Sequence, residues 1–303
     1  MVSVTRMQIM PQPFGDLLNS WFRTIGRNWK TLVATSLVAQ VPIGLAVLIA
    51  FWVTGSAGEL AELLSSDVEL IPPDQLATAL RPLVWTASIW LLLQVPATVF
   101  IYLAAARIVA DDWSGSHSTT GEASGLALRR TATGIAWVII VLLAATALIG
   151  VAVGIGWLVI TSAGANFLTV FVTAVITLTV LVGLVWLSVS VSFGLPIIAV
   201  EGSGSIGALP RSYSLVMGRW WVTLGFVALV GFIASAASQV LSLVLVPVYV
   251  AGLFVPEAFA LALVAAMVLQ APFTAAAAAG YTIWYIDLRS RRETLLTEHL
   301  ARP

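Results

Sequence analysis

The residues that could do chemistry in this sequence are few and scattered. The chain has no cysteine and only two histidines, His117 and His299, which excludes thiolate metal sites and thiol nucleophiles. The stretch 114–117 reads Ser-Gly-Ser-His, but a lone motif fragment has a high false-positive rate, so we interpret it as a polar loop. The stretch 202–205, Gly-Ser-Gly-Ser, lacks the spacing of a nucleophile elbow. The sequence therefore predicts no catalytic residue, no metal site and no cofactor.

Three carboxylates each follow a long apolar stretch, and arginines accompany them in the same polar segments. We expect acids and arginines of neighbouring segments to meet in an interlock, for which the candidates are Asp111, Glu201, Arg211, Asp287 and Arg289. Partial burial would make such pairs stabilise more than exposed pairs, which contribute about 0–1 kcal/mol. The alternative is that these arginines only attract anionic lipid, at about 1 kcal/mol each.

The elements that must position these residues are strongly apolar. The 303 residues are 60% hydrophobic and 9% charged, with a mean hydropathy of +1.02, whereas soluble domains carry about 25% charged residues. A bilayer core about 30 Å thick requires about 20 apolar helical residues. The uncharged runs predict an all-α membrane protein without a nucleic-acid partner, with six transmembrane helices near 29–53, 83–106, 134–160, 167–198, 220–246 and 258–286.

The basic residues gather on one side of such a protein. Both termini and the loops 107–133 and 199–219 share that side, which holds thirteen of the fourteen Lys and Arg residues; only Arg81 lies on the other. Cytoplasmic loops are enriched in Lys and Arg, which predicts a multi-pass protein of the bacterial cell membrane with both termini in the cytoplasm. The acidic outer loop 55–81 fits a short amphipathic helix around Leu60–Leu64 and a plain solvated loop equally well.

The chain also resembles itself at three places. Residues 15–32 and 207–224 share eight positions at an offset of 192, and a weaker copy lies at 123–138. Each copy contains the pattern Gly-x-x-Trp, formed by Gly26 and Trp29, Gly134 and Trp137, and Gly218 and Trp221. We interpret the glycine as a turn from a cytoplasmic interfacial helix into a membrane helix, and the tryptophan as an interface residue; this structural role is favoured over a binding role.

The repeat predicts one polytopic membrane domain over 1–303. Its units are about 14–112, 123–201 and 206–287, each an interfacial helix followed by a pair of membrane helices, and 288–303 is a cytoplasmic tail. Three helix pairs of this kind are expected to pack around a pseudo-threefold axis.

Glutamines are the main polar side chains inside the predicted helices. The candidate intramembrane polar residues are Gln40, Gln94 and Gln270, with Gln239 as a further glutamine. No charged residue lies near the middle of a helix, whereas such residues mark proton relays and ion pathways. Gln94 and Gln270 each lie two residues before a proline, so a role in hydrogen bonding the backbone groups that proline leaves free is favoured over a substrate site.

Several dispersed signatures together resemble the membrane domain associated with glycerophosphoryl diester phosphodiesterases. They are Phe14-Gly15-Asp16 with Trp21, Pro196 with Glu201, the stretches 211–215 and 218–221, and Tyr285-Ile286-Asp287-Leu288-Arg289. The resemblance covers nearly the whole chain. In that family the membrane domain precedes a separate catalytic barrel or stands alone. Because only a short tail follows Asp287, the resemblance implies a stand-alone member without phosphodiesterase activity.

Three functions remain open at this point. The first is a non-enzymatic membrane module, that is, a lipid-interacting scaffold or a partner subunit, with membrane lipid and a membrane protein or second copy as partners. The second is a transporter or carrier for an amphipathic or lipid-derived substrate, which needs a cavity between repeats lined by glutamines and serines. The third and least favoured is a membrane-embedded hydrolase that uses Asp111, Asp112 or Glu201 with a metal.

Overall fold

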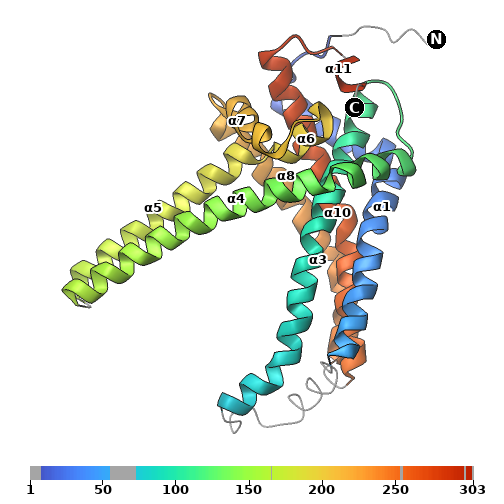
Figure 1. Ribbon diagram of the computed structural model, residues 1–303. Helices are drawn as coiled ribbons and strands as arrows, with labels where there is room; N and C mark the ends of the chain where they lie inside the picture. Colours follow the sequence, from blue (N-terminus) through green and yellow to red (C-terminus); the bar gives the residue numbers. More distant parts are fainter. Residues whose placement is uncertain (1–7, 55–72, 165, 253–254, 297, 302–303) are drawn as a thin grey trace.

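The computed structural model describes residues 8–54, 73–164, 166–252, 255–296 and 298–301. This part of the chain is helical, and its strand-like pairing is limited to an isolated bridge between Gln8 and Leu296. The long helices are α1 (Phe14–Val53), α3 (Pro73–Trp113), α4 (Thr120–Ala163), α5 (Phe167–Val191), α8 (Trp220–Ser242) and α10 (Pro256–Arg292) (Figure 1). The short ones are α6 (Gly194–Glu201), α7 (Ser205–Val216), η2 (Leu243–Leu245), α9 (Val246–Gly252) and α11 (Glu298–Ala301).

Six helical stretches of the described residues are long and apolar enough to cross a membrane. They are Phe14–Val53, Val84–Trp113, Thr120–Ala163, Phe167–Glu201, Trp220–Gly252 and Ala260–Arg292. Each exceeds the roughly 20 residues that a bilayer requires, so the prediction of six membrane helices is confirmed and the chain is a multi-pass membrane protein. The amphipathic helix considered around Leu60–Leu64 lies outside the described residues.

The break between α4 and α5 falls where small and turn-forming residues predict it. Gly164 ends α4 with a φ of 73°, a left-handed value that glycine adopts without steric cost. Asn166 then caps α5, because its side chain accepts a hydrogen bond from the Thr169 amide at 3.1 Å. These caps separate one long uncharged run into two antiparallel helices.

The fourth membrane stretch differs from the prediction of one continuous helix. A turn at Ser192 and Phe193 interrupts the helix between α5 and α6. Pro196 has no N–H to donate to the carbonyl of Ser192, which weakens the helix at this point. The hydroxyl of Ser212 on α7 compensates, since it accepts from the Phe193 amide at 3.3 Å and donates to the Ser190 carbonyl at 2.9 Å.

The expected turn at each Gly-x-x-Trp glycine occurs in only one of the three copies. Gly218, with a φ of 87°, separates α7 from α8, whereas α1 continues through Gly26 and α4 through Gly134. The prediction of three separate interfacial helices is therefore corrected to one, α7. Glycine within a helix costs about 1 kcal/mol relative to alanine, which helices as long as α1 and α4, with 40 and 44 residues, tolerate.

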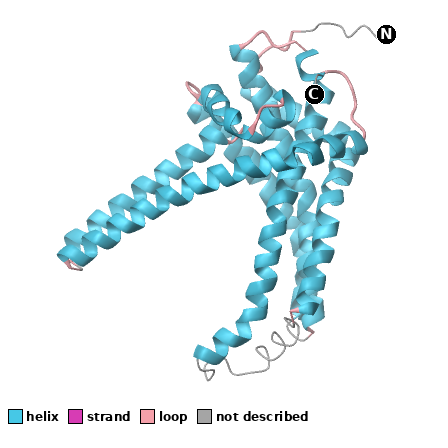
Figure 2. Cartoon of the chain, in the orientation of Figure 1, coloured by secondary structure: helices cyan, strands magenta, loops and turns pink. Residues whose placement is uncertain are grey.

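Helix α10 lies at the centre of the bundle and packs against α1, α3 and α8. The indole of Trp21 on α1 donates to the carbonyl of Ala276 on α10 at 2.8 Å. The indole of Trp284 donates to Thr223 on α8 at 3.1 Å and stacks on Phe226, with ring centroids 4.6 Å apart. The buried core is therefore concentrated toward one end of the bundle, which also carries α6, α7 and both ends of the described chain (Figures 1 and 2).

The α4–α5 hairpin departs from this bundle as a long arm (Figure 1). The most apolar 18-residue stretch of α4 has a mean hydropathy of 2.9 and no buried residue. The corresponding stretch within Phe167–Glu201 has a mean hydropathy of 2.6 with 6% of its residues buried. Each predicted pair is in contact, α1 with α3, α4 with α5, and α8 with α10. Because the second pair diverges from the other two, its packing inside the molecule is confined to the end near α6.

Candidate functional site

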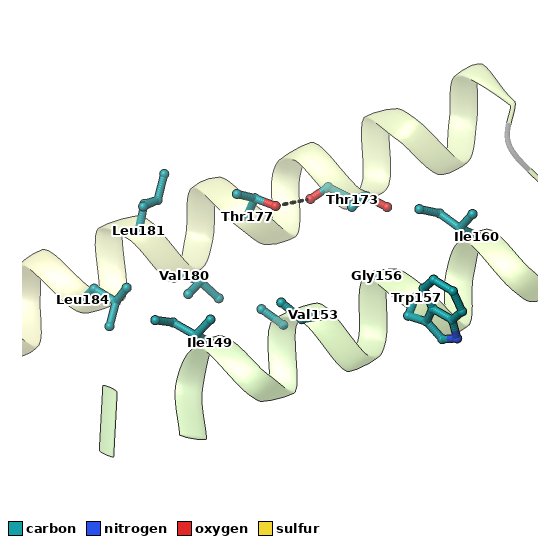
Figure 3. Close-up of a pocket in the computed structure, with 11 residues that line it drawn as sticks. Ile149, Val153, Gly156, Trp157, Ile160, Thr173, Thr177, Val180, Leu181 and Leu184 are labelled. Atoms are coloured by element: carbon teal, nitrogen blue, oxygen red, sulfur yellow. Dashed lines mark hydrogen bonds between the residues drawn. The ribbon is translucent and has the colours of Figure 1, made fainter. Parts of the chain in front are cut away.

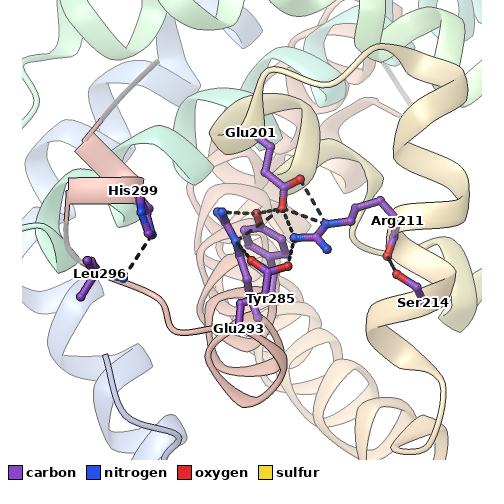
Figure 4. A network of polar contacts seen from close by, with 8 residues as sticks. Glu201, Arg211, Ser214, Tyr285, Glu293, Leu296 and His299 are labelled. Carbon is purple, nitrogen blue, oxygen red and sulfur yellow. Dashed lines mark hydrogen bonds and ion pairs between the residues drawn. The ribbon is translucent and has the colours of Figure 1, made fainter. Parts of the chain in front are cut away.

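Glu201 lies at the centre of a polar network at the end of the molecule that carries α6 and α7 (Figure 4). Its carboxylate accepts from Nε and Nη2 of Arg211 at 3.1–3.2 Å. The hydroxyl of Tyr285 donates to Oε1 at 2.7 Å, and Nε of Arg289 lies 3.7 Å from the same oxygen. The network thus joins α6, α7 and α10 through one carboxylate whose side chain is only 16% exposed.

Glu293 is a second carboxylate of this network. It accepts from Arg211 and, at 3.1 Å, from Nε of Arg289. Burial by itself raises the pKa of Glu293, but hydrogen bonds and charge from the two arginines outweigh burial and hold this pKa below its ordinary value. Burial likewise favours a lower pKa of Arg211, but Glu201 and Glu293 outweigh it and raise that pKa. Opposite charges thus stabilise both groups in their ionised forms.

The local sequence explains why Arg211 returns to Glu201. Gly202 ends α6 in the left-handed conformation, with a φ of 72°, so the chain reverses into α7 within a few residues. Arg130 on α4 donates to the carbonyl of Ile198 and, at 2.9 Å, to that of Ala199. These are carbonyls that the end of a helix leaves without partners. Arg130 therefore fixes the end of α6 and with it the position of Glu201.

Sequence reasoning missed Tyr285 and Glu293 as members of this network, although Tyr285 belongs to one of the signatures of the family resemblance. The spacing contains a signal for Glu293, because Arg289 and Glu293 are four residues apart and such pairs are neighbours on a helix. No comparable signal exists for Tyr285, whose hydroxyl meets Glu201 only because α6 crosses α10.

Asp111 belongs to a different cluster. It pairs with Arg107 one turn earlier at 2.8 Å and accepts from Ser118, while its Oδ1 atom is buried without a hydrogen-bond partner in the described structure. The adjacent Asp112 pairs with Arg27 of α1 at 2.6 Å. Asp112 is therefore the acid that joins the first two membrane helices, whereas Asp111 holds the loop that follows α3.

Asp287 forms a third cluster, which holds the segment before α1. It accepts from the backbone amide of Gln12 at 2.8 Å and pairs with Arg291 at 2.6 Å. The structure thus brings Glu201, Arg211 and Arg289 together and places Asp111 and Asp287 apart from them. The single interlock expected from the sequence is replaced by three clusters, because each acid has its own arginine or backbone donor within reach.

The described residues contain no group of three or more histidine and carboxylate side chains that could hold a metal ion. The carboxylates described above are instead engaged by arginine. The partners of Glu201 are two arginines and the phenol of Tyr285, a set that suits a structural contact between helices.

The three tryptophans of the Gly-x-x-Trp pattern lie in different environments. Trp29 and Trp221 are 53% and 78% exposed, as an interface role requires. Trp137 is buried, and its indole lies against Gly194, where a Cβ atom would overlap three ring atoms. Trp137 therefore packs α4 against the start of α6 rather than facing an interface.

The intramembrane glutamines divide into two kinds. Gln40 on α1 donates to Gln94 on α3 at 3.1 Å, and this hydrogen bond joins the two helices. Gln270 instead lines a polar cavity of about 270 Å³, together with Tyr102, Gly231, Ala234, Ser235, Ser238, Gln239, Phe273, Thr274, Ala277 and Tyr281. This cavity lies between α8 and α10 of the third helix pair, and Tyr102 of α3, which belongs to the first pair, forms part of its wall.

Comparisons of this chain with protein-family models, with curated proteins and with solved structures found no match.

Proposed function

We propose that this chain is a non-enzymatic membrane module that interacts with lipid and acts as a scaffold or partner subunit. The α4–α5 arm is the observation that carries this proposal. Side chains along both helices face outward, among them Leu143, Val153 and Trp157 on α4 and Leu178 and Val182 on α5, each more than 60% exposed. Apolar surface of this extent is unfavourable in water and requires a lipid or protein environment.

The two helices of the arm touch along a shallow apolar groove (Figure 3). The groove has a volume of about 480 Å³, and its lining includes Ile149, Val153, Gly156, Val180 and Leu184. Besides the indole N–H of Trp157, the polar groups there are the hydroxyls of Thr173 and Thr177, and both hydroxyls donate to backbone carbonyls of their own helix. The arm thus presents mainly hydrocarbon to its surroundings, which favours acyl chains or another apolar helix as its neighbour.

The setting of this module is part of the same proposal. We place it in the bacterial cell membrane with both termini in the cytoplasm, because the arginine clusters all lie at the end that carries α6 and α7. We also retain the proposals that the chain derives from a threefold repeat and that it is a stand-alone relative of the phosphodiesterase-associated membrane domain. Their support is the recurrent Gly-x-x-Trp pattern and the signatures quoted above.

Site-specific photocrosslinking in cells tests this function. A photoreactive residue at Val153 or Val182 should form adducts with phospholipid, and adducts with a second polypeptide would identify the partner-subunit form. The control position is Val230, which is fully buried on α8 and should crosslink only within the chain. Crosslinks from the arm to other helices of the same molecule would refute the proposal, because the arm would then pack on its own bundle.

A second candidate function is a carrier for an amphipathic or lipid-derived substrate. The polar cavity between α8 and α10 favours it, since a carrier requires polar groups inside the membrane that a headgroup can meet. Proteoliposomes that translocate fluorescent short-chain lipids faster than protein-free vesicles would support this function, and equal rates would count against it.

A further inference from the structure

We propose that the cavity between α8 and α10 binds the uncharged, hydroxyl-rich headgroup of a lipid, with a sugar or glycerol moiety inserted from the bilayer. This inference rests on the proposed lipid-interacting function and names the class of lipid. The cavity is defined by its polar lining, which comprises Tyr102, Ser235, Ser238, Gln239, Gln270, Thr274 and Tyr281.

The cavity lies at membrane depth. All of its lining residues belong to helices that are long and apolar enough to cross a bilayer. Along α10, Tyr281 precedes Asp287 by six residues and Gln270 precedes it by seventeen, which correspond to about 9 Å and about 26 Å at 1.5 Å per residue. The cavity therefore extends from near the layer of ion pairs into the hydrocarbon region.

The two carboxamides in the cavity lack partners within the described chain, whereas the Thr274 hydroxyl donates to the Gln270 carbonyl at 3.4 Å. Neither carboxamide, of Gln239 or of Gln270, makes a hydrogen bond to another described residue, and both side chains belong to exposed residues. In hydrocarbon an unsatisfied polar group costs several kcal/mol. Gln40 and Gln94, by contrast, share a direct hydrogen bond within the membrane helices. The cavity glutamines thus require hydrogen-bonding partners from outside the protein.

The lining selects the chemical class of the ligand. Carboxamides, hydroxyls and phenols supply donors and acceptors together, which matches hydroxyl groups that also do both. No lysine, arginine, aspartate or glutamate lines the cavity, so a phosphate or carboxylate would be desolvated without a counter-ion, at a high cost. An uncharged polyhydroxyl headgroup satisfies the carboxamides without that cost.

The size and position of the cavity indicate a lipid rather than a free sugar. A volume of about 270 Å³ lies just below the roughly 300–1,000 Å³ of pockets that enclose a whole small molecule. It admits a headgroup and leaves the acyl chains outside. Because Ser235, Gln239 and Gln270 are exposed on the membrane-spanning surface, the headgroup can enter sideways from the bilayer while its chains remain in lipid.

Native mass spectrometry of the full chain in phosphatidylcholine nanodiscs tests this site. Nanodiscs would be doped in turn with monoglucosyl diacylglycerol and with phosphatidylglycerol, which separates an uncharged sugar from an anionic headgroup. We expect the glycolipid to be retained at least tenfold over phosphatidylcholine, and the double variant Q239L/Q270L to lose about tenfold of that preference with its hydrogen bonds.

The matched control is Q40L/Q94L, which removes two intramembrane glutamines that hydrogen-bond to each other and leaves the cavity lining intact. It should retain the glycolipid. If Q239L/Q270L fails to fold, Tyr281→Phe removes a single hydroxyl from the cavity and should lower retention several-fold. No preference for the glycolipid, equal retention by the cavity variants, or stronger retention of phosphatidylglycerol would each overturn the inference. If the nanodisc experiment contradicts the inference while photocrosslinking at Val153 still yields lipid adducts, the headgroup site is wrong but the proposed function stands.

Discussion

Reversing the charge of Arg211 is the most direct test of the joint between α6, α7 and α10. The guanidinium makes hydrogen bonds to Glu201 and Glu293, and in Arg211→Glu a third carboxylate would face these two. Breaking a fully buried pair costs about 3–5 kcal/mol, whereas exposed pairs contribute about 0–1 kcal/mol. The Arg211 and Glu201 side chains are 30% and 16% exposed, so we expect a loss of about 2 kcal/mol in the free energy of unfolding, between these limits.

The assay is the thermal unfolding of detergent-purified protein, in which about 2 kcal/mol corresponds to a fall in Tm of about 3 °C for a chain of 303 residues, at an unfolding entropy of about 2.1 cal/mol/K per residue. The control is Arg129→Glu, since Arg129 is exposed near the same end and forms no ion pair in the described structure. The exchange R211E/E201R should restore part of the loss. R211E/D287R should not, because Asp287 holds Arg291 and Gln12 instead. Equal Tm values for Arg211→Glu and Arg129→Glu would refute the joint.

Three further predictions concern pH, packing and orientation. The pKa of Glu293 is lower in the folded protein than in the unfolded chain, so its contribution to stability is present above about pH 4.5 and is lost as pH falls through the folded pKa; Glu293→Gln should flatten the decrease in Tm measured below pH 5. Gly194→Ala places a methyl group on the Trp137 indole and should cost about 1–3 kcal/mol by overpacking, with partial rescue in G194A/W137L by the same Tm assay. A cysteine at Ser162 should react with an impermeant thiol reagent in intact cells and one at Ser203 should not, and the reverse pattern would invert the proposed orientation.

The sequence predicted the membrane helices well because their signal is long and local. Twenty or more uncharged apolar residues determine a span with little help from tertiary contacts, and the break at 161–166 contains its own caps in Gly164 and Asn166. The interruption at Ser192 was missed for the opposite reason. Proline weakens a helix without fixing where it ends, and here Ser212, twenty residues later, supplies the hydrogen bonds that stabilise the break.

The polar clusters were predicted in kind, but the predicted pairing holds only around Glu201, which meets Arg211 and Arg289. Arginines and acids recur in each polar segment of the sequence, and the structure places them near one another. Which acid meets which arginine depends on how each helix is rotated about its own axis. The spacing of residues along one helix does not determine that rotation. A one-residue step along an α-helix turns a side chain by about 100°. That turn separates Asp111, which holds its own loop, from Asp112, which holds α1.

The Gly-x-x-Trp pattern shows how one motif leads to different structures in different surroundings. At Gly218 the left-handed φ of 87° ends α7 and lets α8 leave in a new direction. At Gly134 the helix continues, because the missing side chain is used instead for close packing: a Cβ atom there would overlap Val99 and come within 3.2 Å of Leu195. Three residues later Trp137 then reaches the bare backbone of Gly194. The same glycine that permits a turn in one copy thus permits helix contact in another, and the choice follows from which neighbouring helix lies opposite it.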